Sequence, residues 1–114
     1  MTPNELVPNL KAVTRDGKNV FLWDYRQKCH TVLIHEPSAA PETFQAWTEA
    51  AKQDPKLWDW LDVQFLQSAE PKEALAAGIY EIDRYGHLIQ FVPNGQWNLE
   101  RIEKDFISYE ACNC

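Results

Sequence analysis

The stretch from Thr31 to Gln53 constrains the fold of this chain more than any other. It places three consecutive apolar residues, Val32, Leu33 and Ile34, before a proline-flanked turn and an amphipathic segment. An unbroken apolar run of this length is typical of a strand that is covered on both faces, as in the central sheet of an α/β protein. The stretch therefore predicts a central strand, a sharp turn and a helix packed on the sheet.

The segment after the turn has the spacing of a helix. Pro41 suits the first helical turn, because the N–H that proline lacks has no partner there, and Pro55 marks the end. Glu42 to Gln53 presents one apolar face for packing on the sheet, formed by Phe44, Trp47, Ala50 and Ala51.

Two hairpins are predicted from glycine-containing turns between short apolar runs. Asp16-Gly17 separates the runs 10–14 and 20–23, and Asp83 to Gly86 separates the runs 79–82 and 87–92. Glycine accepts the positive φ that such turns require. The sequence thus opens with one hairpin and carries another near its end.

The remaining elements are one strand and two helices. The run 61–66 reads as a strand, and the segment 70–77, closed by Gly78, reads as a short helix. A last helix follows the N-cap Asn98, with an apolar stripe of Leu99, Ile102, Phe106 and Tyr109. The predicted order is hairpin, strand, helix, strand, helix, hairpin, helix.

Composition limits the class of protein. The chain has 114 residues, 45% of them hydrophobic, which is enough for a single domain over residues 1–114 with one core. The net charge is −6 and basic residues form no cluster, so neither nucleic acid nor an anionic membrane surface is the expected partner. The first ten residues lack a signal-peptide pattern, so a cytoplasmic location is expected, although a leader removed earlier is compatible with the sequence.

The element order and three short motifs resemble the thioredoxin-like redoxins, that is, the alkyl hydroperoxide reductase/thiol-specific antioxidant proteins and their membrane-tethered thiol-disulfide relatives. The opening stretch has Pro8-Asn9-Leu10, Asp16-Gly17-Lys18 and then Leu22 to Lys28, which is similar to the family's first hairpin. Val32-Leu33-Ile34 is similar to the strand before the active turn, and Ile82 to Gly86 is similar to the family's C-terminal Ile-Asp-Arg-Asp-Gly hairpin. The resemblance implies a thioredoxin-like α/β fold with a central mixed sheet, an N-terminal β-hairpin and flanking helices.

The resemblance also shows where the redox site is expected and what occupies it. The family's Cys-Pro-Pro-Cys falls on Ala40-Pro41-Glu42-Thr43, and the family's cis-proline position falls on the segment 76–78, which has no proline. Disulfide exchange requires a thiolate at the helix N-terminus, which neither Ala40 nor Thr43 supplies. The resemblance therefore implies a redoxin with a degenerate active site.

The degenerate turn keeps features of a binding site. Unpaired N–H groups at a helix N-terminus can accept an anion, a carboxylate or a peptide backbone. The candidate binding residues are Ser38, Ala40, Pro41, Glu42 and Thr43, together with His35. Two alternatives stay open, since Ser38 and Thr43 can simply cap the turn and His35 can be a packed or surface histidine.

The cysteines offer a second candidate site. Cys112 and Cys114 can form a small strained disulfide, and the last helix is expected to bring them toward Cys29. Three thiols with His30 as a fourth ligand would satisfy a zinc tetrahedron, although the spacing matches no standard zinc motif. The alternative is a mobile tail at residues 112–114, as is common for chain ends.

Three functions follow from these features. The first is a non-catalytic thioredoxin-fold module, without a cofactor, that binds a protein partner through an aromatic surface around Trp47, Trp58, Trp60 and Trp97. The second is a thiol-disulfide or peroxide oxidoreductase that uses Cys112 and Cys114. The third is a metal-binding cysteine cluster. The sequence names neither the partner nor the oligomeric state.

Overall fold

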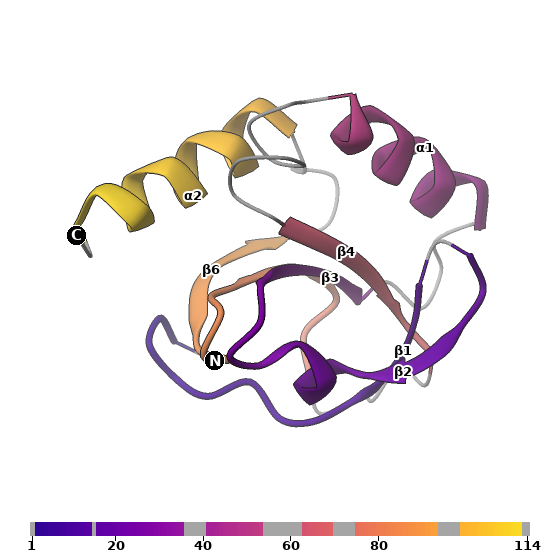
Figure 1. Ribbon diagram of the computed structural model, residues 1–114, viewed down its shortest axis with the longest axis horizontal. Coiled ribbons are helices and arrows are strands. Elements are labelled where there is room, and N and C mark those ends of the chain that lie inside the picture. Colours follow the sequence, from indigo (N-terminus) through magenta and orange to yellow (C-terminus); the bar gives the residue numbers. More distant parts are fainter. Residues whose placement is uncertain are drawn as a thin grey trace.

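The protein is described from a computed structural model that covers residues 2–14, 16–35, 41–53, 63–69, 75–93 and 99–112, without the side chains of residues 41–44, 47, 51 and 112. Six strands form one sheet in the order β2-β1-β4-β3-β5-β6 (Figure 1). The strands are β1 (Lys11–Val13), β2 (Asn19–Phe21), β3 (His30–His35), β4 (Val63–Ser68), β5 (Gly78–Ile82) and β6 (Leu88–Pro93). The helical elements are the 3₁₀ helix η1 (Leu22–Tyr25) and the α-helices α1 (Pro41–Lys52) and α2 (Leu99–Cys112).

β3 is the central strand that the apolar run predicts. All six of its residues are buried, and it pairs in parallel with β4 and antiparallel with β5. The sheet is therefore mixed, as expected. Because side chains alternate along a strand, β3 supplies both faces of the sheet with apolar groups.

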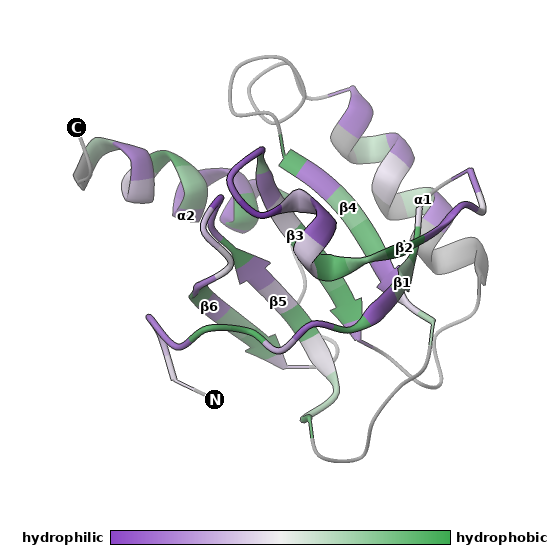
Figure 2. Ribbon diagram, turned by 60° about the horizontal axis from the view of Figure 1, so that its bottom comes forward, coloured by the Kyte–Doolittle hydropathy of each residue, from purple (hydrophilic) through white to green (hydrophobic). Residues whose placement is uncertain are grey.

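The two faces of the sheet carry separate apolar clusters. On one face, Val32 and Ile34 of β3 pack with the fully buried Ile102 and Phe106 of α2. On the other face, Leu33 packs with Val7 and other residues of the N-terminal segment. Figure 1 shows α1 and α2 on one side of the sheet and η1 on the other. In Figure 2, hydrophobic segments of the strands between them alternate with hydrophilic ones.

Most predicted elements are confirmed with small shifts of their ends. Both hairpins form, with positive φ at Gly17 and Gly86 in their turns. The first hairpin ends earlier than expected, since Leu22 and Trp23 belong to η1. The Asp24 carboxylate accepts a hydrogen bond from the Phe21 N–H at 2.9 Å, which caps η1 and ends β2.

The helix predicted over residues 70–77 is wrong where the structure describes it. Residues 75–77 form bends without helical structure that lead into β5, while residues 70–74 lie outside the described part. The Tyr80 hydroxyl donates to the Ala76 carbonyl at 2.6 Å, which ties this segment to the strand in place of a helical bond. The predicted cap Asn98 and the start of the 61–66 strand also lie outside the described residues.

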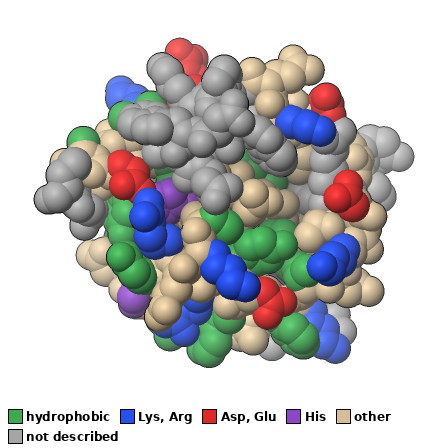
Figure 3. All heavy atoms as spheres, in the orientation of Figure 1, with side chains coloured by type: hydrophobic (Ala, Val, Ile, Leu, Met, Phe, Trp, Pro, Cys, Tyr) green, Lys and Arg blue, Asp and Glu red, His purple; other side chains and the backbone are tan. Residues whose placement is uncertain are grey.

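Two further observations concern the described surface. Neither α1 nor α2 is long and apolar enough to cross a membrane. On the face shown in Figure 3, the described acidic and basic side chains are interspersed and form no patch of one sign.

Candidate functional site

The turn that sequence analysis singled out follows β3 and precedes α1. β3 ends at His35 and α1 begins at Pro41, so the connection has the predicted position in the fold. Ser38 and Ala40 lie outside the described residues, and Pro41, Glu42 and Thr43 are described only as the first residues of α1. Their proposed role in binding therefore stays a prediction.

His35 is a packed histidine at the end of β3. Its side chain is fully buried, its Nδ1 lies 2.7 Å from the Ser68 hydroxyl, and its ring makes an edge contact with Tyr80. These contacts fix the imidazole inside the sheet. The position of His35 fits the packing alternative, because a ligand in solvent has no access to this side chain in the structure.

Two of the cysteines are placed at the opposite end of β3. Cys29 is buried and directly precedes β3, which has six residues. At about 3.3 Å per residue, roughly 17 Å separate the two ends of such a strand. Cys112 is the last residue of α2, and its side chain and the whole of Cys114 lie outside the described part. Cys29 is thus remote from the N-terminus of α1.

α2 does run toward the start of β3, as the topology predicts. The Glu110 carboxylate lies 2.5 Å from Nε2 of His30, and the Arg84 guanidinium forms an ion pair with the same carboxylate. The residue next to Cys29 therefore contacts a residue two positions before Cys112. The distances among the thiols themselves are not described.

His30 and Glu110 form a pair in which a neutral imidazole lies beside an ionised carboxylate. Burial lowers the pKa of His30, against the opposing effect of Glu110. The hydrogen bond with His30 lowers the pKa of Glu110. Both directions fit an Nε2–H that donates to the carboxylate. Because the His30 side chain is fully buried and its Nδ1 has no described hydrogen-bond partner, the pair ties α2 to β3 and offers no accessible base.

Asp83 organises the β5–β6 turn beside this pair. Its Oδ1 accepts hydrogen bonds from the backbone N–H groups of Tyr85 and His87, and its Oδ2 accepts one from the Tyr109 hydroxyl at 2.8 Å. Burial and the bond to Asp83 raise the pKa of Tyr109 to about 12. The phenol is therefore a permanent donor to Asp83 at physiological pH.

The described residues do not assemble a metal centre. No group of three or more His, Cys, Asp and Glu side chains among them has the geometry to hold a metal ion. The predicted cluster of Cys29, Cys112, Cys114 and His30 also involves side chains outside the described part. It stays a prediction, and His30 would have to leave Glu110 to offer its Nε2 as a ligand.

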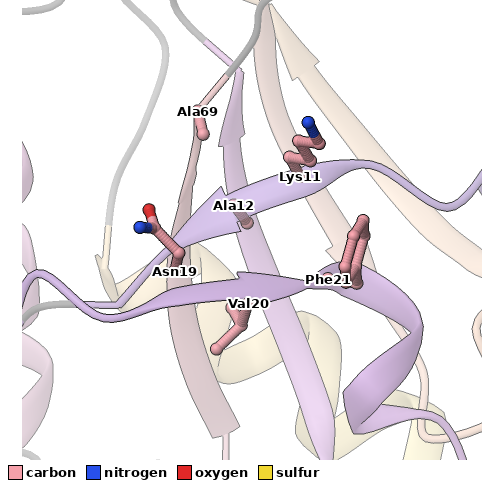
Figure 4. A pocket seen from close by; sticks show the side chains of 6 residues that line it. All are labelled: Lys11, Ala12, Asn19, Val20, Phe21 and Ala69. Atoms are coloured by element: carbon pink, nitrogen blue, oxygen red, sulfur yellow. The ribbon is translucent and has the colours of Figure 1, made fainter.

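A pocket of about 390 Å³ lies at the other edge of the sheet, between β1, β2 and the end of β4 (Figure 4). Among the described residues of its lining, one carries an ionisable group, the Lys11 ammonium, and one carries a large aromatic ring, that of Phe21. Such a lining suits the binding of an apolar group better than acid–base chemistry.

Sequence reasoning missed the polar groups that α2 brings to the sheet. Arg84 and Glu110 are 26 residues apart and meet at His30. The buried Glu81 meets the partly exposed Asp105 beside the apolar cluster. One signal in the sequence could have indicated these contacts, namely a charged residue within an apolar strand or beside the apolar stripe of a helix. Glu81 stands on the same face of β5 as Ile79, and Asp105 directly precedes Phe106.

No protein-family profile and no curated protein matches the sequence. Solved structures do match. The mitochondrial 2-Cys peroxiredoxin of Plasmodium falciparum has a TM-score of 0.62 at 12% identity, over 98% of this chain and 96% of that one. A protein described as a putative disulfide isomerase from Bacteroides thetaiotaomicron has a TM-score of 0.57 at 17% identity, over 99% and 89% of the two chains.

Arabidopsis thaliana ScoI with copper bound has a TM-score of 0.59 at 11% identity, over 95% of this chain and 99% of that one. Sequence identities this low indicate a shared fold and do not indicate a shared activity. The mixed six-stranded sheet and these matches together show that the chain has a thioredoxin-like fold.

Proposed function

We propose that this chain is a thioredoxin-fold protein that acts by binding another protein, without disulfide exchange at the turn between β3 and α1. The observation that carries this proposal is the position of the thiols. The segment from Ser38 to Thr43 contains no cysteine, and Cys29 lies at the far end of β3. A thiolate must stand at the helix N-terminus to be activated by its N–H groups and dipole.

The described surface has apolar groups for a partner to cover. Leu6, Phe21, Trp23 and Tyr85 expose between 37% and 53% of their surface. Phe21 is the last residue of the edge strand β2, and it also lines the pocket of Figure 4. Aromatic rings are enriched at protein interfaces, so we place the contact surface at Phe21. The expected surface around Trp47, Trp58, Trp60 and Trp97 concerns side chains outside the described part.

The test compares partner capture by four immobilised forms of the full chain: the wild type and three variants. The Cys29→Ser/Cys112→Ser/Cys114→Ser variant is expected to capture the same proteins as the wild type, and salt or competing soluble protein should release them. Phe21→Ala should weaken capture, whereas Tyr85→Ala, which removes an equally exposed ring near the opposite edge of the sheet, should not. Capture that is lost in the serine variant, or that only a reductant releases, would contradict the proposal.

A further inference from the structure

Glu81 is a buried acid in the apolar layer between the sheet and α2. It lies in β5, its side chain is fully buried, and both of its carboxyl oxygens lack a described hydrogen-bond donor. Asp105 of α2 interacts with it, and the Asp105 Oδ2 is also buried without a described donor. Two carboxyl groups therefore meet where donors are missing.

Among the residues that the structure describes, few other polar groups face this pair. On α2, the Arg101 Nε lies 3.9 Å from the Asp105 Oδ2. In the flanking strands, the residues paired with Glu81 are Val32 of β3 and Gln90 of β6, which carry no charge. His30 is on the same face of β3, and its Nε2 is engaged by Glu110.

A proton shared by the two carboxyl groups would reduce their repulsion and give one of them a hydrogen-bond donor. The Glu81 side chain is fully buried, whereas the Asp105 side chain is 29% exposed and has only its Oδ2 buried. A second negative charge beside the buried Glu81 has a large cost, whereas one retained proton lets one carboxyl group donate to the other. Burial, followed by the charge of Asp105, raises the pKa of Glu81 to about 9. The charge of Arg101 opposes this rise in pKa without cancelling it. The retained proton thus supplies a donor to carboxyl oxygens that have none among the described residues.

We propose that a proton shared by Glu81 and Asp105 holds α2 on the sheet, and that α2 detaches locally when this proton leaves. α2 is the C-terminal described element, and its removal breaks no strand pairing of β3, β4 or β5. Detachment would uncover Ile102, Phe106 and His30, which are fully buried in the closed form. The helix is therefore an opening element that responds to pH.

The direction and size of the response follow from proton linkage. Once α2 is open, Glu81 is hydrated and regains an ordinary pKa near the reference value of 4.5, against about 9 when closed. Between these two values, opening releases one proton. The equilibrium constant for opening therefore rises about tenfold per pH unit, or roughly 100-fold from pH 6 to pH 8.

The first test is a carboxyl-carbon NMR titration of the full chain. In the wild type, the Glu81 resonance is expected to have a midpoint near 9. In Asp105→Asn, the midpoint should fall toward the acid range, because the neighbouring charge is gone. A wild-type midpoint near 4.5, or a midpoint that Asp105→Asn leaves unchanged, would overturn the shared proton.

The second test is hydrogen exchange of residues 99–112, corrected for the intrinsic pH dependence of exchange. Protection of α2 should fall by about 100-fold from pH 6 to pH 8 while β3 stays protected. Glu81→Gln should remove this slope, and the exposed Glu100→Gln of the same helix should keep it. A flat wild-type profile, an unchanged slope in Glu81→Gln, or simultaneous loss of protection in β3 would overturn the local opening.

Discussion

Gly78→Ala tests how tightly the sheet closes beside the turn after β3. Gly78 begins β5, pairs with His35 and with Pro93, and has a φ of +156°. A Cβ atom at this position would lie 2.5 Å from the Val92 carbonyl oxygen and 2.7 Å from the Phe91 ring. Val92 lies in β6 and pairs with Ile79 of β5. Its carbonyl therefore cannot move away without disturbing the pairing of these two strands.

The expected cost has two parts. A non-glycine residue in this backbone region costs about 1–2 kcal/mol, and overpacking against fixed neighbours adds about 2–3 kcal/mol. We therefore expect Gly78→Ala to lower the free energy of unfolding by about 3–5 kcal/mol. Urea denaturation followed by circular dichroism measures this change.

Gly17→Ala is the matched control. Gly17 has a φ of +82°, and a Cβ atom there would meet nothing within 4 Å, so only the backbone part applies. Both substitutions restrict the unfolded chain equally, so this effect cancels in the comparison. If the two variants differ by less than about 1 kcal/mol, the steric part of the reasoning is wrong.

Three further predictions concern the core, the α2 contact and the turn. Phe106→Ala removes a fully buried ring and should lower the free energy of unfolding by about 3–5 kcal/mol in urea denaturation. Glu110 has a lowered pKa in the folded state, so its contribution to stability is present above the unfolded pKa and is lost as pH falls through the folded one. Glu110→Gln should therefore reduce the acid-side loss of stability, seen as a flatter melting-temperature profile below pH 5. Ala40→Cys/Thr43→Cys should give the chain insulin-reducing activity above that of the wild type, because it places thiols at the N-terminus of α1.

The central part of the fold could be predicted because its signals are local. The apolar run 32–34 marks a strand buried on both faces, and Gly17 and Gly86 mark turns that need positive φ. The first helix follows from Pro41 and its apolar spacing. The alanines of the segment 75–77 favour helix locally, whereas in the structure the segment bends into β5 and the Tyr80 hydroxyl bonds to its Ala76 carbonyl.

The polar contacts could not be predicted because they join distant segments. His30 and Glu110 are 80 residues apart, and neither residue alone signals an ion pair. The pairing of Glu81 with Asp105 depends on how α2 lies across β5, which the spacing of its apolar stripe does not specify. From the sequence, His35 is a candidate binding residue with packing as the alternative, and its burial and its contact with Ser68 become known only from the structure.

We propose above that this protein does not exchange disulfides at the turn between β3 and α1. Redox turnover of the full chain tests this proposal most directly. Insulin reduction and peroxide consumption should be measured with dithiothreitol, glutathione and a thioredoxin system as electron donors. The wild type is expected to match the Cys29→Ser/Cys112→Ser/Cys114→Ser variant with every donor, because no thiol stands in the segment 38–43. Turnover in the wild type that disappears in Cys112→Ser, with an unchanged circular dichroism spectrum, would contradict the account and identify a redox enzyme that works from its C-terminal thiols.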